Sequence, residues 1–416
     1  YFSAEESQLS PSCRVNPTSA DEVAQVLNIT TQFGCKFAVR SGGHMPWAGA
    51  ANIDQPGVTI DLGFLNTTTL SEDKSTAHVG PGSRWGAVYS ALAPEGRVVV
   101  GGRSTHVGAG GYLLGGYQMV LANGTIVEVN EQENADLFWA MHLGSTNFGI
   151  VTRYDLKTTE DTRMWGGHRF YNRSHALEAA EALLDFNEKS GDQGLDSMGF
   201  DLGSNEVFFM DYSRIKPEND TDVFQAPLSV PFVRDTTRAN ATLTSLIEEI
   251  DAAYPIGAHV SFRTLAFKPD AQFMIDWWQE GLRIFKPYEG NPNLNWTLIY
   301  APMPLSMIKA AEAVDDPQGL SSKNGSLILT NLTGFWMGNL DEDDIQSKLA
   351  QLLNWGRTTA EQRGLFNQWI YLNYASPDQD PYAGIPTANA QRLRDIRQSV
   401  DPDGVFKSLW PGGFKL

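Results

Sequence analysis

The spacing of hydrophobic residues changes in character near residue 160. Before that point, short apolar runs that predict strands alternate with segments whose apolar residues recur at helical spacing. The predicted strands are 12–15, 36–40, 58–62, 76–80 and 97–102, and the predicted helices are 17–32 and 83–92. An Asn-Gly turn inside 119–129 predicts a hairpin, followed by a short helix at 135–142 and a strand at 149–156.

After residue 160, longer segments alternate apolar and polar residues, which is typical of strands in an antiparallel sheet. They occupy 198–212, 259–267, 295–303 and 326–336, and the helical patterns among them occupy 175–188 and 242–254. The tail predicts a strand over 368–374 and a helix over 389–400. The chain therefore predicts an α+β protein with a large antiparallel sheet that has helices on one face.

The composition narrows the class of protein. A chain of 416 residues predicts two domains, or one domain with a large insertion. A net charge of −18 disfavours binding to nucleic acid or to anionic membranes. No apolar run reaches 18 residues, so no membrane span is expected, and the opening YFSAEESQLS suggests a mature or trimmed product.

Nine Asn-x-Ser/Thr sequons favour the secretory pathway and N-linked glycans. They lie at Asn28, Asn66, Asn123, Asn172, Asn219, Asn240, Asn295, Asn324 and Asn331. In an oxidising compartment, the only two cysteines, Cys13 and Cys35, are expected to form a disulfide; the alternative is a pair of buried thiols. No Cys/His metal-binding spacing is present, and no metal is expected.

Three glycine-rich segments suggest a site for a diphosphate. The sequence SGGH at 41–44 directly follows a predicted strand, 101–116 contains seven glycines, and 147–151 reads NFGIV. Glycines permit positive φ angles, so that successive N–H groups can face one anion. No phosphate-binding loop of the Walker type and no GxGxxG at a helix start is present, so this hypothesis depends on loops alone.

Several motifs in order resemble those of one known family. FAVRSGGHMPWAG, VGPGSRWGAVYSAL, VGGRSTHVGAGGYLLGG, NFGIVTRYDL, YLNYASPDQDPY and DPDGVF resemble the FAD-linked oxidases of the vanillyl-alcohol-oxidase type. The resemblance is strongest to the fungal berberine-bridge-enzyme-like and oligosaccharide-oxidase branch. It implies a PCMH-type FAD-binding domain of two subdomains at 1–160, a substrate domain at 161–364, and a segment at 365–416 that returns to the FAD domain.

The same resemblance implies a covalent bond between His44 and the 8α-methyl group of FAD. A neutral imidazole is nucleophilic near pH 7, which suits this role; the alternative is a structural turn histidine. Arg40 is expected to bind phosphate or to brace the turn. The implied cofactor-binding residues are Arg40, Ser41, Gly42, Gly43, His44, Gly108, Gly110, Gly111, Leu113, Gly115, Gly149, Val151 and Asn373.

One segment departs from the family pattern. Family members carry roughly twenty more residues between LLGG and the VLANG strand, and in doubly tethered members these include a flavin-bound Cys. Here LLGG leads directly into YQMVLANG, and no Cys follows Cys35. Either the covering loop is absent, or residues are missing between Gly116 and Tyr117; we favour the second interpretation, which leaves a second tether unknown.

On the substrate side, the resemblance implies that Tyr371 is the base or binds the substrate hydroxyl. Tyr374 would assist it, and Asn373 would lie near the flavin. A strand over 368–374 would place Tyr371 and Asn373 on one face and Tyr374 on the other. The alternative is that Tyr371 is a core tyrosine.

Two weaker candidates complete the site. Trp277–Trp278 could stack on a substrate, although adjacent aromatic residues are more often core. His106 could lie near the flavin or be structural.

These features predict a secreted FAD-dependent oxidase. It would oxidise a hydroxyl of a carbohydrate or secondary-metabolite alcohol and reduce O2 to H2O2, with a small-molecule substrate and dioxygen as its partners and no nucleic acid or membrane. Two alternatives remain open, namely oxidative cyclisation or C–C bond formation on a fungal metabolite, and a flavin-holding cyclase or binding protein without redox turnover.

Overall fold

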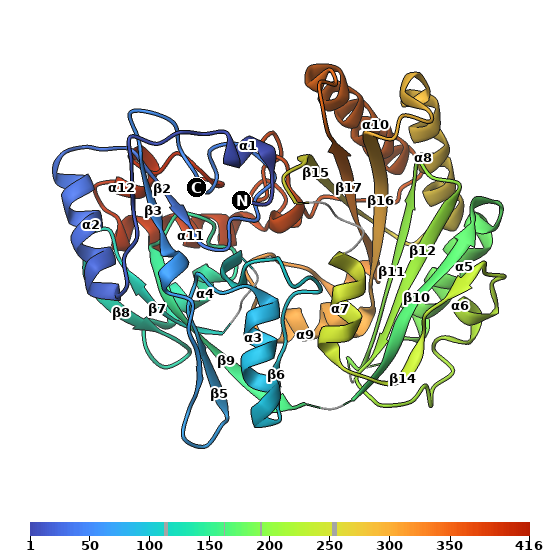
Figure 1. Cartoon of the computed structure of the whole chain (residues 1–416), viewed down its shortest axis with the longest axis horizontal. Helices are drawn as coiled ribbons and strands as arrows, with labels where there is room; N and C mark the ends of the chain where they lie inside the picture. Colours follow the sequence, from blue (N-terminus) through green and yellow to red (C-terminus); the bar gives the residue numbers. More distant parts are fainter. Residues whose placement is uncertain (112–114, 162, 192–193, 252–255) are drawn as a thin grey trace. The chain divides into compact units, whose positions relative to one another are not determined.

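The computed structural model describes residues 1–111, 115–161, 163–191, 194–251 and 256–416, which form two compact units (Figure 1). The first unit contains Tyr1–Asp161, Ile247–Ala258 and Ile385–Leu416, and the second contains Thr162–Leu246 and His259–Gly384. Compared with the sequence-derived domain boundaries, 247–258 groups with the first unit and 365–384 groups with the second. No helix among the described residues is long and apolar enough to cross a membrane.

The first unit contains two small sheets. One is parallel with strand order β1-β3-β2, and the other is antiparallel with order β4-β5-β9-β7-β8, to which β6 adds by pairing with β9. Its strands are β1 (Cys13–Val15), β2 (Phe37–Arg40), β3 (Val58–Asp61), β4 (Thr68–Leu70), β5 (Thr76–Val79), β6 (Arg97–Val99), β7 (Gly116–Val120), β8 (Ile126–Val129) and β9 (Ile150–Glu160). Its helices are α1 (Ala4–Ser7), α2 (Ala20–Gln32), α3 (Trp85–Leu92), α4 (Ala135–Met141), α11 (Thr387–Val400) and α12 (Val405–Ser408), with 3-10 turns η1 (Leu62–Phe64), η2 (Ala93–Glu95) and η3 (Ala109–Gly111).

Local signals explain several of these elements. Helix α2 begins after Ser19, whose side chain accepts a hydrogen bond from the Glu22 N–H, while the Glu22 carboxylate accepts one from the Thr18 N–H. Its Val23 and Leu27 are fully buried, as expected for residues four apart on one helix face. The predicted hairpin is β7–β8, and Gly124 adopts a φ of +79° in its turn.

The second unit is built on one nine-stranded antiparallel sheet, with order β13-β10-β12-β11-β16-β17-β15-β18 and with β14 paired to β10. Its strands are β10 (Met164–Asn172), β11 (Asp196–Gly203), β12 (Val207–Arg214), β13 (Arg234–Asp235), β14 (Arg238–Ala241), β15 (His259–Phe267), β16 (Leu294–Met303), β17 (Leu327–Trp336) and β18 (Phe366–Asn367). Its helices are α5 (Ala176–Lys189), α6 (Gln225–Ser229), α8 (Ala271–Ile284), α9 (Leu305–Ala313) and α10 (Glu342–Gln362), with η4 (Arg173–His175), η5 (Lys286–Tyr288), η6 (Ser322–Asn324) and η7 (Leu372–Tyr374). Helix α7 (Leu243–Asp251) begins in this unit, and its last residues group with the first.

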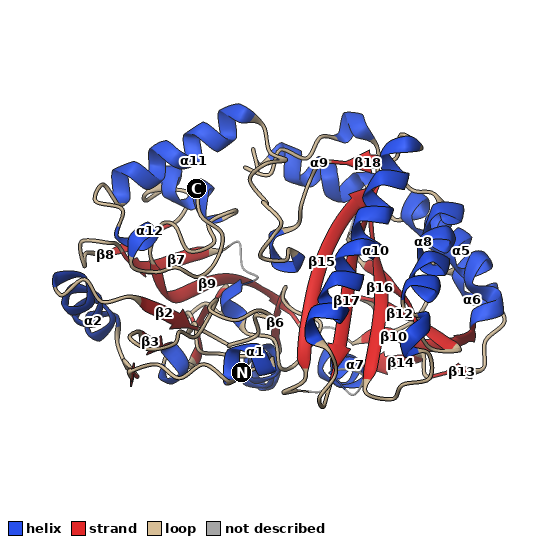
Figure 2. Cartoon of the chain, turned by 90° about the horizontal axis from the view of Figure 1, so that it is seen from above, coloured by secondary structure: helices blue, strands red, loops and turns tan. Residues whose placement is uncertain are grey.

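Helices α5, α8 and α10 cover one face of this sheet (Figure 2). The core between them contains alternate residues of the central strands, including Leu298, Tyr300 and Leu332, together with Trp277 of α8. The predicted α+β class, with a large antiparallel sheet flanked by helices, is therefore confirmed.

The predicted strand over 368–374 is wrong. Strand β18 pairs with β15 only at Ala266 and Phe267, and the chain then forms the 3-10 turn η7. Farther along β15, the side-chain amide of Gln379 bonds both the N–H and the C=O of Thr264, at 2.9 and 2.8 Å. A side chain thus occupies the strand edge that residues 368–374 would have needed.

The expected disulfide is also not formed, since both cysteines are free. Cys13 in β1 and Phe37 in β2 both pair with Val58 of β3, which runs between them. Two strand spacings of about 4.8 Å separate β1 from β2, which exceeds the Cα separation of about 7 Å that a disulfide permits. Cys13 therefore lies in the strand on one side of β3, while Cys35 lies two residues before the strand on its other side.

Candidate functional site

The SGGH turn follows directly from β2. Gly43 has a φ of +65°, a conformation that glycine adopts without strain. Before the turn, Arg40 Nη1 donates to both carboxylate oxygens of Asp61, at 2.9 and 2.8 Å, and its guanidinium lies over the Tyr1 ring. In the structure Arg40 pairs with Asp61, which also accepts from the Gly63 N–H at 3.0 Å, and the two roles expected for Arg40 stay predictions.

Three loops of the first unit converge beside this turn, namely 41–44, 80–84 and 104–111. Ser41 Oγ donates to the Pro81 carbonyl, and the Ala109 N–H donates to the Ser83 carbonyl at 2.9 Å. The Trp85 N–H donates to the Val107 carbonyl at 3.0 Å. The first two glycine-rich segments predicted from sequence therefore lie together, joined by the loop that precedes α3.

Most of the predicted glycines lie where two parts of the chain come so close together that a side chain would not fit. A Cβ on Gly108 would lie 2.6 Å from the Gly42 Cα, and one on Gly149 would lie 2.8 Å from the Val120 carbonyl oxygen. Side chains on Gly110 and Gly115 would collide with Ser41 Oγ and the Asp155 carbonyl, respectively. At Gly111, by contrast, a Cβ would meet nothing within 4 Å among the described residues, which exclude 112–114.

Two further predicted cofactor residues of the first part of the chain are Val151 and Leu113. Val151 is in β9, where it pairs with Met119 of β7. Leu113 belongs to 112–114, which lie outside the part of the chain that the structure describes. Strand β7 runs from Gly116 to Tyr117 without a break in its pairing to β9.

His44 is half-buried, and its imidazole stacks on the Phe2 ring with centroids 3.8 Å apart and planes 10° apart. The pKa of His44 is lowered from 6.5 to about 4, mainly by burial and with a smaller contribution from the guanidinium of Arg84, while a main-chain hydrogen bond and the carboxylate of Asp251 oppose the change. The imidazole is therefore neutral at physiological pH, the form in which a ring nitrogen is nucleophilic.

The converging loops fit a polar, phosphate-bearing cofactor. Ser83 is 2% exposed, and its hydroxyl has no hydrogen-bond partner among the described residues. The Trp47 Nε1, three residues after His44, is likewise buried without a partner in the described part of the chain. Buried polar atoms in native proteins are nearly always paired, so these two point to a bound group. Together with the neutral imidazole, they fit the FAD expected from sequence.

Sequence reasoning missed Asp251, the last residue of α7. Its carboxylate accepts hydrogen bonds from the Ser104 and Thr105 hydroxyls and, at 3.0 Å, from the Thr105 N–H. The pattern EEIDAAY shows only the end of an amphipathic helix, so no local signal could have identified this contact.

The proposed substrate-side residues lie in the second unit, around η7. Asn373 Nδ2 donates to Tyr371 Oη at 3.0 Å, and the Tyr371 and Tyr374 rings meet edge to face with centroids 5.0 Å apart. The predicted opposite orientation of the two tyrosines is wrong, because residues three apart eclipse in a 3-10 helix. All three side chains are half-buried.

A polar cluster anchors the segment after η7. Arg263 Nη1 donates to both carboxylate oxygens of Asp378, at 2.9 and 2.8 Å, and Gln379 accepts from the Ser376 N–H while it pairs with Thr264. Because Gln379 lies five residues after Tyr374, this cluster fixes one end of the segment that carries both tyrosines.

The structure also shows where the weaker candidates, Trp277, Trp278 and His106, lie. Trp277 and Trp278 are core residues, since both are buried and their Nε1 atoms donate to the Leu352 and Gly203 carbonyls. His106 belongs to the 104–111 loop, where its N–H donates to Ser104 Oγ at 3.3 Å.

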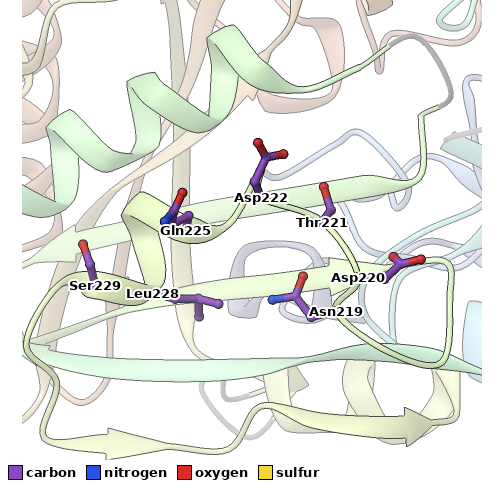
Figure 3. Close-up of a pocket in the computed structure, with 7 residues that line it drawn as sticks. All are labelled: Asn219, Asp220, Thr221, Asp222, Gln225, Leu228 and Ser229. Atoms are coloured by element: carbon purple, nitrogen blue, oxygen red, sulfur yellow. The ribbon is translucent and has the colours of Figure 1, made fainter.

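A surface pocket of the second unit contains none of the predicted site residues. It is lined by Asn219, Asp220, Thr221, Asp222, Gln225, Leu228 and Ser229 (Figure 3). Asp220 is engaged by Arg214 and Lys216, so the pocket shows no acid–base arrangement.

Comparisons with known proteins decide the family. A family model described as "FAD binding domain" matches residues 11–130. An FAD-dependent monooxygenase of Fusarium proliferatum is 30% identical over 100% of this chain and 87% of its own length. The chain belongs to the family of FAD-dependent oxidoreductases that contains this Fusarium protein. An FAD-dependent monooxygenase of Penicillium roqueforti is 34% identical over 98% of this chain and 87% of its length. FAD is the cofactor of the family, as expected from sequence.

Solved structures show the same fold. 6-Hydroxy-D-nicotine oxidase from Arthrobacter nicotinovorans matches with a TM-score of 0.80 and 19% identity, over 98% of this chain and 93% of its own. Xylooligosaccharide oxidase from Myceliophthora thermophila matches with a TM-score of 0.77 and 19% identity, over 100% and 94%. Glucooligosaccharide oxidase from Acremonium strictum, with a 6-S-cysteinyl, 8α-N1-histidyl FAD, matches with a TM-score of 0.71 and 18% identity, over 97% and 92%. The PCMH-type fold is thereby confirmed.

The relatives are longer than this chain. The alignment with the Fusarium protein extends over 461 residues against 416 here, so that relative carries residues that this chain lacks. A second flavin tether stays unassigned.

Proposed function

We propose that this chain is an FAD-dependent oxidase that carries its flavin on His44 and oxidises a hydroxyl group of a carbohydrate or secondary-metabolite alcohol. The observation that supports it most is a neutral, half-buried imidazole at the end of a glycine turn, packed against a second glycine-rich loop. In the overall reaction, the substrate loses two hydrogens to become a carbonyl compound, and O2 gains them to become H2O2.

His44 provides the attachment point. Attachment would join a ring nitrogen of His44 to the flavin 8α-carbon with loss of one proton from the imidazole and one from the methyl group, and the two electrons released would pass to O2, giving H2O2. Because His44 is neutral, its lone pair is available without prior deprotonation. The main chain of 41–44 and 104–111 and the Ser83 hydroxyl would hold the rest of the cofactor.

Tyr371 would take the proton of the substrate hydroxyl. FAD, when bound, accepts the hydride from the substrate carbon. Tyr371 Oη must be free of its own proton to act as a base, and the N–H that Asn373 donates to this oxygen stabilises that form. Tyr374, in edge-to-face contact, orients the Tyr371 ring.

A second candidate is a monooxygenase, favoured by the names of the relatives that are 30–34% identical. Such an enzyme transfers one oxygen atom of O2 to its substrate and reduces the other to water, using two electrons from a reductant such as a nicotinamide. Both candidates use the same flavin site and differ in the fate of oxygen.

One experiment tests the attachment and then the reaction. The protein is denatured in acid and digested, and the peptide containing His44 is weighed; an added mass of flavin is expected, and H44A should lack it. Free release of flavin from the native sequence would refute the covalent link. Turnover under ¹⁸O2 with a panel of sugars and aromatic alcohols then separates the candidates, because an oxidase yields labelled peroxide and an unlabelled product.

We further propose that the protein is secreted and glycosylated. Six sequon asparagines are exposed, and Asn219 and Asn295 are half-buried. The exposed ones are Asn28, Asn66, Asn123, Asn172, Asn240 and Asn324. Asn331 is 4% exposed within β17 and is not available to a glycan in the folded chain.

A further inference from the structure

A segment from the middle of the chain reaches the glycine loops. Residues 247–258 group with the first unit, although the sequence around them builds the second. At the end of α7, one carboxylate oxygen of Asp251 accepts from the Ser104 hydroxyl, and the other accepts from the Thr105 hydroxyl and N–H. A single side chain thus receives three hydrogen bonds from two consecutive residues.

The loop held by Asp251 leads to the His44 turn. The Gly86 N–H bonds the Thr105 carbonyl at 3.1 Å, and the Trp85 N–H bonds the Val107 carbonyl at 3.0 Å. The next residue, Gly108, lies so close to Gly42 that neither position admits a side chain. A shift of Ser104 and Thr105 would therefore also displace the turn that carries His44.

The same segment also holds the residue stacked on His44. The Gly257 N–H donates to the Phe2 carbonyl at 2.8 Å, and the Ala258 carbonyl accepts from the Ala4 N–H at 2.9 Å. Phe2 in turn stacks on the His44 ring, and its N–H donates to the Gly43 carbonyl at 2.9 Å. Asp251 thus holds the loop beside the His44 turn, while Gly257 and Ala258 hold the N-terminal segment whose Phe2 ring stacks on the imidazole.

We propose that Asp251 is a positioning residue for attachment of the flavin to His44, because it holds the 104–108 loop against the turn in the arrangement that attachment requires. This inference rests on the proposed covalent link. Asp251 acts through Ser104 and Thr105 and takes no part in bond formation itself.

The test compares attachment rates at saturating FAD. Apoprotein is mixed with FAD, and flavin that survives acid denaturation is measured over time for the native sequence, D251A and D251N. We expect D251A to attach flavin at least tenfold more slowly. D251N should be intermediate, since its amide oxygen can still accept from Thr105 and its N–H can donate to Ser104 Oγ.

The control variant is D270A. Asp270 also accepts a main-chain N–H, that of Phe273 at 2.7 Å, but it caps α8 in the second unit. Its loss should lower the melting temperature without slowing attachment below that temperature. If D251A does not fold, the double variant S104A/T105V removes the same hydroxyl donors from the other side and should slow attachment to a similar degree.

The outcomes separate the two proposals. If the native sequence attaches flavin at His44 and folded D251A does so at the same rate, the positioning role is wrong and the proposed function stands. If the native sequence attaches no flavin at His44, both are overturned. Slow attachment by D251A and D270A alike would show a general loss of stability and would also overturn the positioning role.

Discussion

Asn373 donates a hydrogen bond to the phenol oxygen of Tyr371. The contributions of these two residues to flavin reduction can be measured separately. Under the proposed mechanism, Y371F removes the base, and flavin reduction by substrate without oxygen should slow by roughly 10²–10⁴-fold. N373L leaves the phenol in place and should slow reduction by about tenfold, because only the stabilising N–H is lost. Stopped-flow bleaching of the flavin band measures both rates.

The matched control is Y288F, which removes a tyrosine hydroxyl bonded to Asp344 elsewhere in the second unit. The flavin of Y288F should be reduced by substrate at the native rate. Equal rates for Y371F and the native sequence would show that Tyr371 is a core tyrosine after all.

The buried state of His44 predicts how attachment depends on pH. Its pKa is lowered from 6.5 to about 4, mainly by burial, so the folded protein keeps the ring neutral where an unfolded chain would already bind a proton. Attachment should therefore stay nearly constant from pH 8 to pH 5 and fall only as the pH approaches about 4. A rate that halves near pH 6.5 would contradict this environment for His44.

At the scale of residues, the sequence predicts those site residues whose position is determined by their neighbours in the chain. His44 follows a strand and a glycine turn, so its place was recognisable from adjacent residues alone. Ser83 and Asp251 were not, because their importance arises from contacts with residues distant in sequence; Asp251 lies 147 positions from Ser104. Most of the glycines predicted to bind the cofactor lie against a neighbouring part of the chain, and their contact with a cofactor stays a prediction.

At the scale of loops, Gly108 and Gly111 offer a sharp comparison. G108A should destabilise the apoprotein by several kcal/mol, because its Cβ would lie 2.6 Å from the Gly42 Cα and main chain on both sides cannot yield cheaply. G111A should leave the apoprotein as stable as the native sequence, since none of the residues that the structure describes lies within 4 Å of the new Cβ. Thermal unfolding of both apoproteins measures the difference, and equal melting temperatures would contradict the close packing of the two loops.

The anchor of the η7 segment is the second element-scale feature. Gln379 pairs with the N–H and C=O of Thr264 as a neighbouring strand would. Q379A should cost about 1–3 kcal/mol of unfolding free energy, since the Thr264 groups lose their partners. Hydrogen exchange should show faster exchange at the Thr264 amide, whereas the Thr333 amide, within the β15–β17–β16 pairing, should not change. Unchanged exchange at Thr264 would mean that the anchor does not hold.

The 368–374 segment shows why an element could be mispredicted. Trp369 and Tyr371 fit an alternating strand, whereas Tyr371 and Tyr374 fit a turn with three residues per repeat. Only the tertiary structure decides, because Gln379 takes the free edge of β15 beyond β18. The long alternating segments, such as β16 and β17, had no comparable competitor and were predicted correctly.

At the scale of the whole molecule, the two compact units are not contiguous in sequence. Residues 247–258 and 385–416 join the first unit after long stretches that belong to the second. Hydrophobic periodicity reports how each segment folds but not which neighbour it joins, so the return of 247–258 could not be read from the sequence. Because the first unit includes these later segments, its cofactor loops are fixed only once the whole chain has folded.

If the protein is secreted, the fold predicts which of its sequons carry glycans. If the protein passes through the secretory pathway, glycan mapping of material secreted by a eukaryotic host should find occupied sites only among the eight sequons that are not buried. Asn331 should be unoccupied, because β17 pairs along its length with β15 and β16 and all of its residues are buried. A chain carrying a bulky polar glycan there could not form the central sheet and would not be secreted. Asn66, which is exposed, serves as the positive site, and a glycan on Asn331 of folded, secreted protein would contradict the placement of β17 in the sheet.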